Sequence, residues 1–325
     1  MRVGATVVAG VGAVVLAVVV LAIWWRFDDD IQRARARSAQ GSTVIDTRCG
    51  PIEMQQVGAG VPLLVVHGSG GGHDQGIALA GSLAQHGIRV IAMSRFGYLR
   101  MPMPADASTA AQADAHVCLL DALGIRRAAV MGGSAGAPSA LQMALRHPDR
   151  VSALILLVPI TYKPPTRANS AAPMPAWVEK TMMRMLGSDF LFWAATHLAR
   201  EQVIKLVLAT PPELLTGASL QERARVNSMI DNILPVSARA AGLRSDTAVG
   251  KHLAPAPLES LQVPTLIVSA RDDRYGTYAS AEYTPSRIAG AKFIGFDHGG
   301  HTLVGHDDEV MAEVVKLLNP ALLAR

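Results

Sequence analysis

The sequence has few cysteines and little excess charge, and each scarcity argues against a class of protein. Cys49 and Cys118 are the two cysteines among 325 residues, and neither belongs to a CxxC pair, so neither a disulfide framework nor a cysteine-based zinc site is predicted. We expect two unpaired thiols. The 30 Lys and Arg against 26 Asp and Glu leave a net charge of +4 with no basic block, which argues against nucleic-acid binding.

Apolar residues, by contrast, make up 50% of the chain, which is enough for the core of an enzyme-sized globular protein. They include one uninterrupted run, Val3 to Trp25. A helix needs about 20 such residues to cross the hydrocarbon core of a bilayer. A cleavable signal peptide is the alternative, but its apolar region is about 7–15 residues long and precedes a small-x-small site. This run is longer and ends in Trp24-Trp25, so we predict a single-pass transmembrane anchor.

More arginines follow the apolar run than precede it. Arg2 lies before the run, and Arg26, Arg33, Arg35 and Arg37 lie after it. Because the cytoplasmic flank of a membrane span carries the excess of basic residues, this distribution predicts a membrane protein whose catalytic domain lies in the cytoplasm.

Beyond the anchor, taken as residues 1–26, the chain divides into a linker and a core. Residues 27–41 are charged and polar, which is typical of a juxtamembrane linker. Short Val- and Ile-rich runs then alternate with amphipathic segments over residues 42–160 and 252–325, and this alternation predicts a mostly parallel sheet covered by helices on both faces. The strands are expected at Ile52–Val57, Pro62–His67, Arg89–Met93, Ala128–Gly132, Ser152–Ile160, Pro264–Ala270 and Ala291–Phe296.

Residues 161–251 interrupt this alternation with helical patterns, several prolines and no convincing strand, so we expect an inserted helical cap. An apolar cluster within the cap could line a substrate pocket or contact lipid, but for any one of its members ordinary packing of the cap helices onto the core is the favoured interpretation. The cluster comprises Met182, Met183, Met185, Leu186, Phe190, Leu191, Phe192 and Trp193.

The strongest chemical signal is the pentapeptide Gly132-Gly133-Ser134-Ala135-Gly136, which follows a strand-like run and precedes a helical one. Strand, G-x-S-x-G and helix in this order form the context of a nucleophilic serine. A sharp strand-to-helix turn strains the serine backbone, and only small neighbours leave room for it. We predict Ser134 as the nucleophile, with a tight turn of no catalytic role as the alternative.

A serine hydroxyl is a poor nucleophile, so the hypothesis requires a histidine base and an acid that orients it, in the chain order Ser, Asp or Glu, His. The loop after the strand "PTLIVSA" offers Asp272 and Asp273, and the loop after "AKFIGF" offers His298 and His301. We favour Asp273 and His301, and keep Asp272 and His298 as alternates that otherwise serve as loop residues.

Acyl transfer also needs hydrogen-bond donors for an oxyanion. The strand that ends at His67 runs into a glycine-rich loop whose backbone N–H groups could approach the serine. We assign the oxyanion hole to the N–H groups of Ala135 and Ser69, with Gly70 as the alternate. A phosphate-binding loop is the competing interpretation, but neither G-x-x-x-x-G-K-[ST] nor the full dinucleotide fingerprint is present.

The segments that carry a family resemblance are, in chain order, "LLVVHGSGGG", "RVIAMSRFGYLR", "LLDALGI", "VMGGSAGAPSALQMALRHPDRVSALILLVP", "TLIVSARDD" and "GGH". Through them the chain resembles the α/β-hydrolase superfamily over about Val44 to Ala324, interrupted at the cap. Within it the chain is similar to the esterase, lactonase and C–C hydrolase branch, which has a helical cap after the sixth strand. Ser134 argues against the activities of epoxide hydrolases and haloalkane dehalogenases, because members of the superfamily with those activities carry aspartate at this position.

This resemblance implies a serine hydrolase that cleaves a carboxylic ester, thioester or lactone through a Ser-His-Asp triad and an acyl-enzyme. C–C bond hydrolysis, acyl transfer and non-catalytic ligand binding by a receptor are the alternatives. No metal or organic cofactor is expected. The apolar cap beside a membrane anchor favours a small-molecule, hydrophobic acyl substrate.

Overall fold

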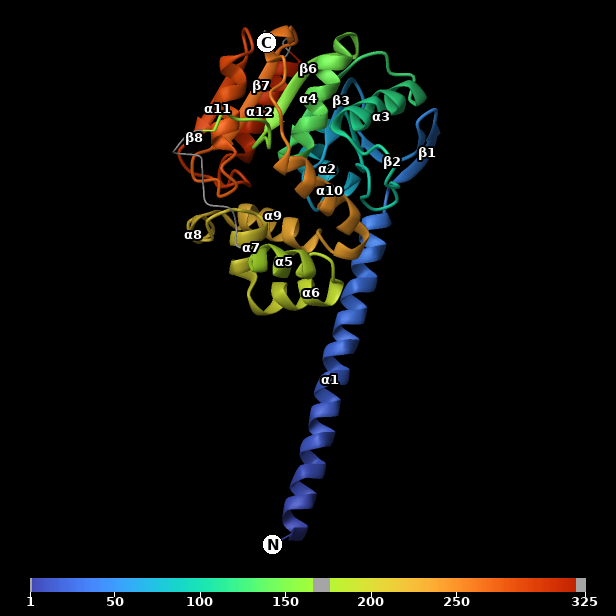
Figure 1. Cartoon of the computed structure of the whole chain (residues 1–325), viewed down its shortest axis with the longest axis vertical. Coiled ribbons are helices and arrows are strands. Elements are labelled where there is room, and N and C mark those ends of the chain that lie inside the picture. The colour runs from blue at the N-terminus through green and yellow to red at the C-terminus, as the bar shows by residue number, and fades with distance from the viewer. Residues whose placement is uncertain (1, 166–175, 320–325) are drawn as a thin grey trace.

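The computed structural model describes residues 2–165 and 176–319, and its centre is one eight-stranded sheet (Figure 1). The strand order is β1-β2-β4-β3-β5-β6-β7-β8; β1 and β2 pair antiparallel, β2 pairs antiparallel with β4, and the remaining neighbours are parallel. The predicted α/β-hydrolase fold with a mostly parallel sheet is therefore confirmed. The strands are β1 (Thr43–Thr47), β2 (Gly50–Val57), β3 (Val61–Val66), β4 (Ile88–Met93), β5 (Ala128–Gly133), β6 (Val151–Leu157), β7 (Thr265–Ala270) and β8 (Lys292–Phe296).

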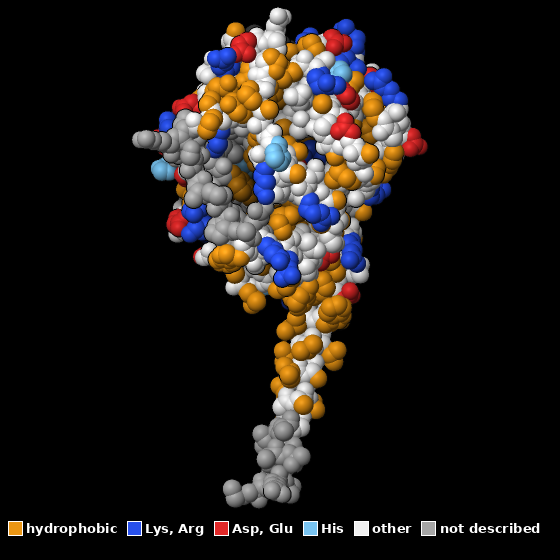
Figure 2. Space-filling view, in the orientation of Figure 1, with side chains coloured by type: hydrophobic (Ala, Val, Ile, Leu, Met, Phe, Trp, Pro, Cys, Tyr) orange, Lys and Arg blue, Asp and Glu red, His pale blue; other side chains and the backbone are white. Residues whose placement is uncertain are grey.

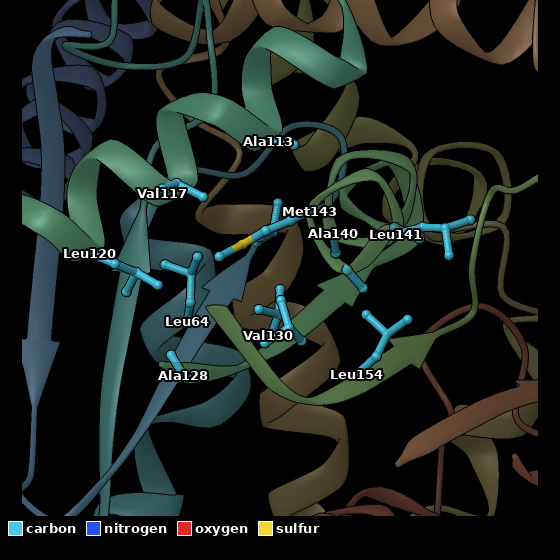
Figure 3. Close-up of a cluster of buried hydrophobic side chains, with 14 of the residues drawn as sticks. Leu64, Ala113, Val117, Leu120, Ala128, Val130, Ala140, Leu141, Met143 and Leu154 are labelled. Carbon is cyan, nitrogen blue, oxygen red and sulfur yellow. The ribbon is translucent and has the colours of Figure 1, made fainter. Parts of the chain in front are cut away.

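Helices cover both faces of the sheet. On one face, Leu64, Val130 and Leu154 pack against Val117 and Met143 of α3 and α4 (Figure 3). On the other, the alternate residues of the same strands pack against α2 and α12. Since side chains of a strand alternate between faces, two apolar layers require nearly continuous apolar strands, as the sequence has. The core helices are α2 (His73–Ala80), α3 (Thr109–Ala122), α4 (Ala137–Arg146), α11 (Tyr278–Ser286) and α12 (Asp307–Leu318).

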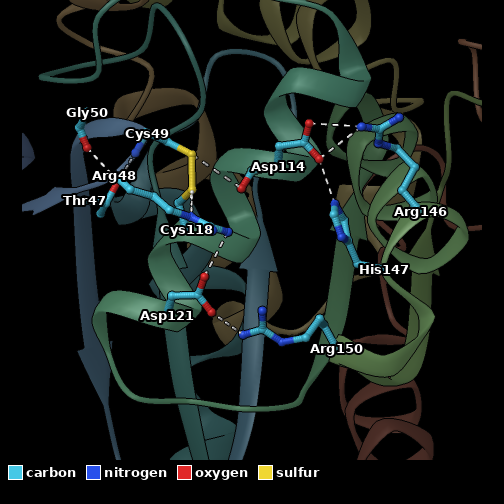
Figure 4. The surroundings of a disulfide bond; sticks show 10 residues. All are labelled: Thr47, Arg48, Cys49, Gly50, Asp114, Cys118, Asp121, Arg146, His147 and Arg150. Carbon is cyan, nitrogen blue, oxygen red and sulfur yellow. Dashed lines mark hydrogen bonds and ion pairs between the residues drawn. A yellow bond between two sulfur atoms is a disulfide. The ribbon is translucent and has the colours of Figure 1, made fainter.

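The expectation of unpaired thiols is wrong, because Cys49 and Cys118 form a disulfide (Figure 4). Cys49 lies in the turn between β1 and β2, and Cys118 lies on α3. The sequence did not predict β1, a short edge strand whose side chains are mostly exposed. Without β1 there was no hairpin to carry Cys49 back over α3, so the pairing could not be inferred from spacing.

The segment expected to be a linker is instead helical. Helix α1 runs without a break from Arg2 to Ala39, and its last part packs against the body of the protein (Figure 1). Phe27, Ile31, Ala34 and Ser38 are buried there. Their spacing of four, three and four residues is that of one helix face, which the intervening charged residues hide in a simple reading of composition.

Between β6 and β7, where the sequence predicted a helical cap, residues 176–251 form six α-helices, here called the inserted helices. They are α5 (Ala176–Met185), α6 (Asp189–Leu198), α7 (Arg200–Val207), α8 (Glu213–Thr216), α9 (Leu220–Asp231) and α10 (Ala240–Lys251). No strand occurs among the described residues of this stretch, 161–165 and 176–251. The inserted helices lie over the edge of the sheet at which the parallel strands end (Figure 1). This edge is where loop side chains from several strands meet.

Candidate active site

Ser134 occupies the turn between β5 and α4 with a backbone φ of 50°, in the left-handed region that non-glycine residues rarely adopt. The neighbouring chain leaves no room for larger residues. A Cβ on Gly136 would lie 2.4 Å from the carbonyl oxygen of Val66, and one on Gly132 would lie 2.7 Å from Cβ of Ala140. Close packing thus requires glycine at positions 132 and 136, and the turn they permit holds the Ser134 hydroxyl at the end of the strand.

Two loops at the same edge bring His301 and Asp273 to this serine. The Nε2 atom of His301 lies 2.8 Å from Oγ of Ser134, and its Nδ1 atom lies 2.8 Å from Oδ2 of Asp273. One imidazole therefore bridges hydroxyl and carboxylate across residues that are far apart in the chain. With Nδ1 donating to the carboxylate, Nε2 is left as an acceptor for the serine proton.

Asp273 is buried, and three donors surround its carboxylate. Besides His301, the backbone N–H of Tyr275 donates to Oδ1 at 2.8 Å, and the hydroxyl of Thr277 donates to Oδ2. In all three hydrogen bonds the carboxylate oxygens are the acceptors. They fix the oxygen that faces the imidazole, and the ring of Tyr275 packs edge-on against His301 with centroids 4.8 Å apart.

The alternates occupy different positions. Asp272 accepts hydrogen bonds from the backbone N–H groups of Gly300 at 2.7 Å and Gly299 at 3.3 Å, so it holds the loop that carries His301. The side chain of His298 is 80% exposed and lies 3.6 Å from Asp272. The geometry therefore brings Asp273 and His301 to the serine, and it places Asp272 and His298 beside that group.

The glycine-rich loop after β3 lies against the turn that carries Ser134. Ser69 and Gly70 line the same cavity as Ser134, and Ala135 is the next residue in the chain. The N–H of Gly70 points at the hydroxyl of Tyr98, 3.4 Å away. Ser69 and Ala135 consequently remain the preferred pair of oxyanion donors, and Gly70 is the weaker choice.

His67, at the start of this loop, is buried and structural. Its Nδ1 atom lies 2.7 Å from the carbonyl of Gly68, and its Nε2 atom accepts the backbone N–H of Arg95 at 2.9 Å. Burial and the nearby Arg95 hold the pKa of His67 well below its usual value, so the ring stays neutral and can accept with one nitrogen while donating with the other.

One inserted helix holds the loop through an ion pair. Asp246 of α10 binds both terminal nitrogens of Arg95 at 2.7 Å, and it also accepts hydrogen bonds from Tyr98 at 2.5 Å and from Ser69 Oγ at 2.8 Å. The paired Asp246 raises the pKa of Arg95 despite its burial. The side chain of Ser69, whose N–H is a predicted oxyanion donor, is therefore fixed by a carboxylate from the inserted helices.

A second ion pair holds the other end of the glycine-rich loop, and in this pair the residue between β6 and β7 supplies the positive charge. Arg239 is fully buried just before α10 and donates to Asp74 at 2.6 Å and to the carbonyl of Gly71 at 2.5 Å. Sequence reasoning missed both pairs and Thr277, because they join residues that only the folded chain brings together. In the sequence, the one sign of these ion pairs was that a charged residue stands within an apolar or glycine-rich run.

Ser134 and His301 open onto a cavity of about 170 Å³ with mainly aliphatic walls. Its lining includes Leu157, Val158, Leu208, Met229 and Met311, from β6, the inserted helices and α12. The predicted apolar cluster of the cap is not among the lining residues; Phe192 and Trp193 pack toward α1 instead. Within residues 2–165 and 176–319, no group of three or more His, Cys, Asp or Glu side chains is placed to hold a metal ion.

Comparison with known proteins gives one family. The family model described as "alpha/beta hydrolase fold" matches residues 61–306. A 2-hydroxymuconate semialdehyde hydrolase of Pseudomonas putida is 41% identical over 103 residues, which span 31% of this chain and 37% of that protein. RutD of Klebsiella pneumoniae, which carries the name of a carbamate hydrolase, is 28% identical over 253 residues, or 74% of this chain and 85% of its own length.

Solved structures agree with this match. An alpha/beta hydrolase fold protein from Nakamurella multipartita is 29% identical, with a TM-score of 0.69 over 86% of this chain and 99% of that one. An esterase from Exiguobacterium antarcticum superposes with a TM-score of 0.62 at 20% identity, over 86% of this chain and 98% of its own, and supports the fold alone.

Proposed function

Because this chain belongs to the alpha/beta hydrolase fold family and is a hydrolase by that membership, we propose that it is a serine hydrolase that cleaves a carboxylic ester, thioester or lactone. The observation that carries the proposal is the pair of 2.8 Å contacts that join Ser134, His301 and Asp273. A serine held in a strained turn, a neutral imidazole and a buried carboxylate in this order are the groups that acyl transfer requires.

In the proposed reaction, the Ser134 oxygen attacks the carbonyl carbon while its proton passes to Nε2 of His301. Asp273 accepts the Nδ1 proton in a hydrogen bond and stabilises the imidazolium that forms. The negative charge that develops on the carbonyl oxygen is stabilised by the N–H groups of Ser69 and Ala135. His301 then gives its proton to the leaving oxygen or sulfur, and the acyl group stays on Ser134.

Water completes the cycle. His301 removes a proton from the attacking water, the second tetrahedral intermediate collapses, and the proton returns to Oγ of Ser134 as the carboxylic acid leaves. The lining of the cavity is mainly aliphatic, with Leu157, Leu208 and Met229, and this supports an apolar acyl group. Polar side chains on the same lining could contact a polar part of the substrate; they are Gln75, Arg225, Ser228, Asn232, Thr302 and Asp307.

A fluorophosphonate probe tests the proposal directly, since it reacts with an activated serine without requiring the natural substrate. We expect the full chain in detergent to be labelled, and the adduct to map to Ser134 by mass spectrometry. Ser134→Ala should abolish the adduct. Ser139→Ala, which removes another buried serine of α4, should keep it. A folded protein without an adduct at Ser134 would favour the non-catalytic receptor.

A second candidate reaction is cleavage of a C–C bond next to a carbonyl, or acyl transfer to an acceptor other than water. The observation that favours C–C cleavage is the 41% identity to a 2-hydroxymuconate semialdehyde hydrolase over 103 residues. Product analysis distinguishes ester hydrolysis from C–C cleavage by the second product. Beside the carboxylic acid, ester hydrolysis releases an alcohol, and C–C cleavage releases a compound in which a C–H bond replaces the broken C–C bond.

Among the described residues, one helix, α1, is long and apolar enough to cross a membrane, and its span is hardly buried by the rest of the protein. We propose that it is a single-pass anchor. The arginines after the span favour a cytoplasmic catalytic domain, whereas the Cys49–Cys118 disulfide favours an oxidising compartment. We assign greater weight to the disulfide, since long domains are translocated largely regardless of charge. We therefore propose that the catalytic domain lies outside the cytoplasm.

Protease treatment of intact spheroplasts tests this orientation. When the full chain is expressed in a Gram-negative bacterium, we expect added protease to digest the catalytic domain while a cytoplasmic marker protein stays intact. Digestion that occurs only after the spheroplasts are lysed would restore the cytoplasmic orientation.

A further inference from the structure

Large exposed apolar side chains lie along the projecting part of α1 (Figure 2) and, apart from α1, mainly on the inserted helices. Among the side chains that the structure describes outside α1, nine large hydrophobic ones are exposed, and six of these belong to α5, α6, α7 and α9. The six are Trp177, Phe190, Leu191, Leu198, Leu206 and Leu220. The catalytic cavity uses none of them. Side chains of this kind, gathered on one part of a protein, indicate an interaction surface.

Helix α6 is attached directly to the anchor. The ring of Phe27 contacts the rings of Phe190 and Trp193, with centroids 5.2 and 5.6 Å apart. The indole N–H of Trp193 donates to Asp30 at 2.9 Å. In Figure 1, α5 and α6 form the end of the body from which the free part of α1 projects. The structure thus fixes α6 to the segment of α1 that follows the apolar span.

The contact begins where the span ends. Trp24 and Trp25 are 59% and 72% exposed, whereas Phe27 is 9% exposed. Two helical residues correspond to about 3 Å along the axis. Because the headgroup region of one leaflet is about 5–8 Å thick, a span that ends at Trp25 would put Phe27 and the part of α6 that contacts it at headgroup depth.

We propose that α5 and α6 rest on the lipid bilayer as an interfacial surface, which we call the bilayer-facing surface; it comprises Trp177, Lys180 and Arg184 of α5 and Leu191 and Leu198 of α6. The proposal rests on the proposed anchor and is independent of the catalytic chemistry. The occupant is the bilayer because α1, the partner of α6, continues into it.

The residue types fit this occupant. On α6, Leu191 and Leu198 are exposed and seven residues apart on one face, next to the partly buried Ala194 and Ala195, while Phe192 and Trp193 are buried on the other face. On α5, the exposed Trp177, Lys180 and Arg184 recur at helical spacing, so one face combines an indole with two cations. Indoles favour the headgroup level, and cations there attract anionic phosphates.

A depth measurement on the full chain in vesicles of phosphatidylcholine and phosphatidylglycerol tests this surface. An environment-sensitive NBD probe is placed on single cysteines, Leu191→Cys or Leu198→Cys, in protein kept oxidised so that the native disulfide does not react. Lipids spin-labelled near the top of the acyl chain serve as quenchers. Trp25→Cys is the positive control. Ser260→Cys is the negative control, since this exposed residue precedes β7 at the opposite edge of the sheet.

We expect emission at Leu191→Cys and Leu198→Cys to fall about twofold with the quencher lipids, as it should at Trp25→Cys, and to stay unchanged at Ser260→Cys. Quenching at Trp25→Cys alone would overturn the bilayer-facing surface and leave the anchor intact. No quenching at Trp25→Cys would overturn both. Blue-shifted but unquenched emission at the two leucine sites would assign the surface to a second protein copy, which also overturns the proposal. Serine labelling would be unaffected in each case.

Discussion

Ser134→Ala should lower kcat for ester hydrolysis by about 10⁴- to 10⁶-fold, because it removes the oxygen that we propose as the nucleophile. His301→Ala should lower kcat by a similar factor, since Ser134 Oγ then loses the acceptor that lies 2.8 Å away. The double variant should be no worse than either single variant, because the two residues act as one unit. Steady-state kinetics with a chromogenic ester measures all three.

His298→Ala is the matched control for these variants, since it removes a histidine from the same loop whose side chain is 80% exposed. Its kcat should stay within about threefold of the native value, as expected for a surface substitution away from the reacting groups. A loss at His298→Ala equal to that at His301→Ala would contradict the assignment, as would additive losses in the Ser134 and His301 double variant.

The parts of this protein that the sequence predicted are those set by local pattern. Short apolar runs predicted seven of the strands within a few residues. The runs are most continuous in β5, β6 and β7, because a strand covered on both faces has no polar side. The pentapeptide around Ser134 predicted the turn, because a Cβ at Gly132 or Gly136 would make contacts of 2.4–2.7 Å that no larger residue tolerates. Loop order after β7 and β8 then limited the acid and the base to two residues each.

The parts that the sequence did not predict depend on contacts between distant segments. The choice between Asp272 and Asp273 is a matter of which carboxylate faces an imidazole, and adjacent residues in a loop carry no pattern that distinguishes them. The disulfide required a hairpin with a weakly apolar strand, β1. The helical continuation of α1 required Phe27 and Ile31 to be recognised as one face within a charged segment.

The contacts between the inserted helices and the oxyanion loop have a consequence for specificity. Asp246 of α10 holds Ser69, and Arg239, just before α10, holds Gly71. The loop that carries a proposed oxyanion donor is therefore braced by the same insertion whose helices α7 and α9 line the cavity. Both ion pairs are largely removed from water, where loss of one partner strands the other charge. Changes in the inserted helices are therefore expected to alter catalysis as well as substrate fit.

The role of Asp273 is the most discriminating prediction. Asp273→Asn should lower kcat by about 10⁴-fold while KM changes little, because an amide can donate to Nδ1 of His301 and stabilise the tautomer that cannot accept the serine proton. The buried carboxylate also accepts hydrogen bonds from Tyr275 and Thr277, so circular dichroism must show that the variant folds.

Asp272→Asn provides the comparison within the same dipeptide. Its carboxylate accepts two backbone N–H groups of the His301 loop, and an amide oxygen can keep one of them. We expect a loss of about 1–2 kcal/mol in the free energy of unfolding and at most about a tenfold loss in kcat, through a less well-held loop. If Asp272→Asn instead lost about 10⁴-fold in kcat and Asp273→Asn did not, Asp272 would be the acid, and the 2.8 Å contact between Asp273 and His301 would be a structural one.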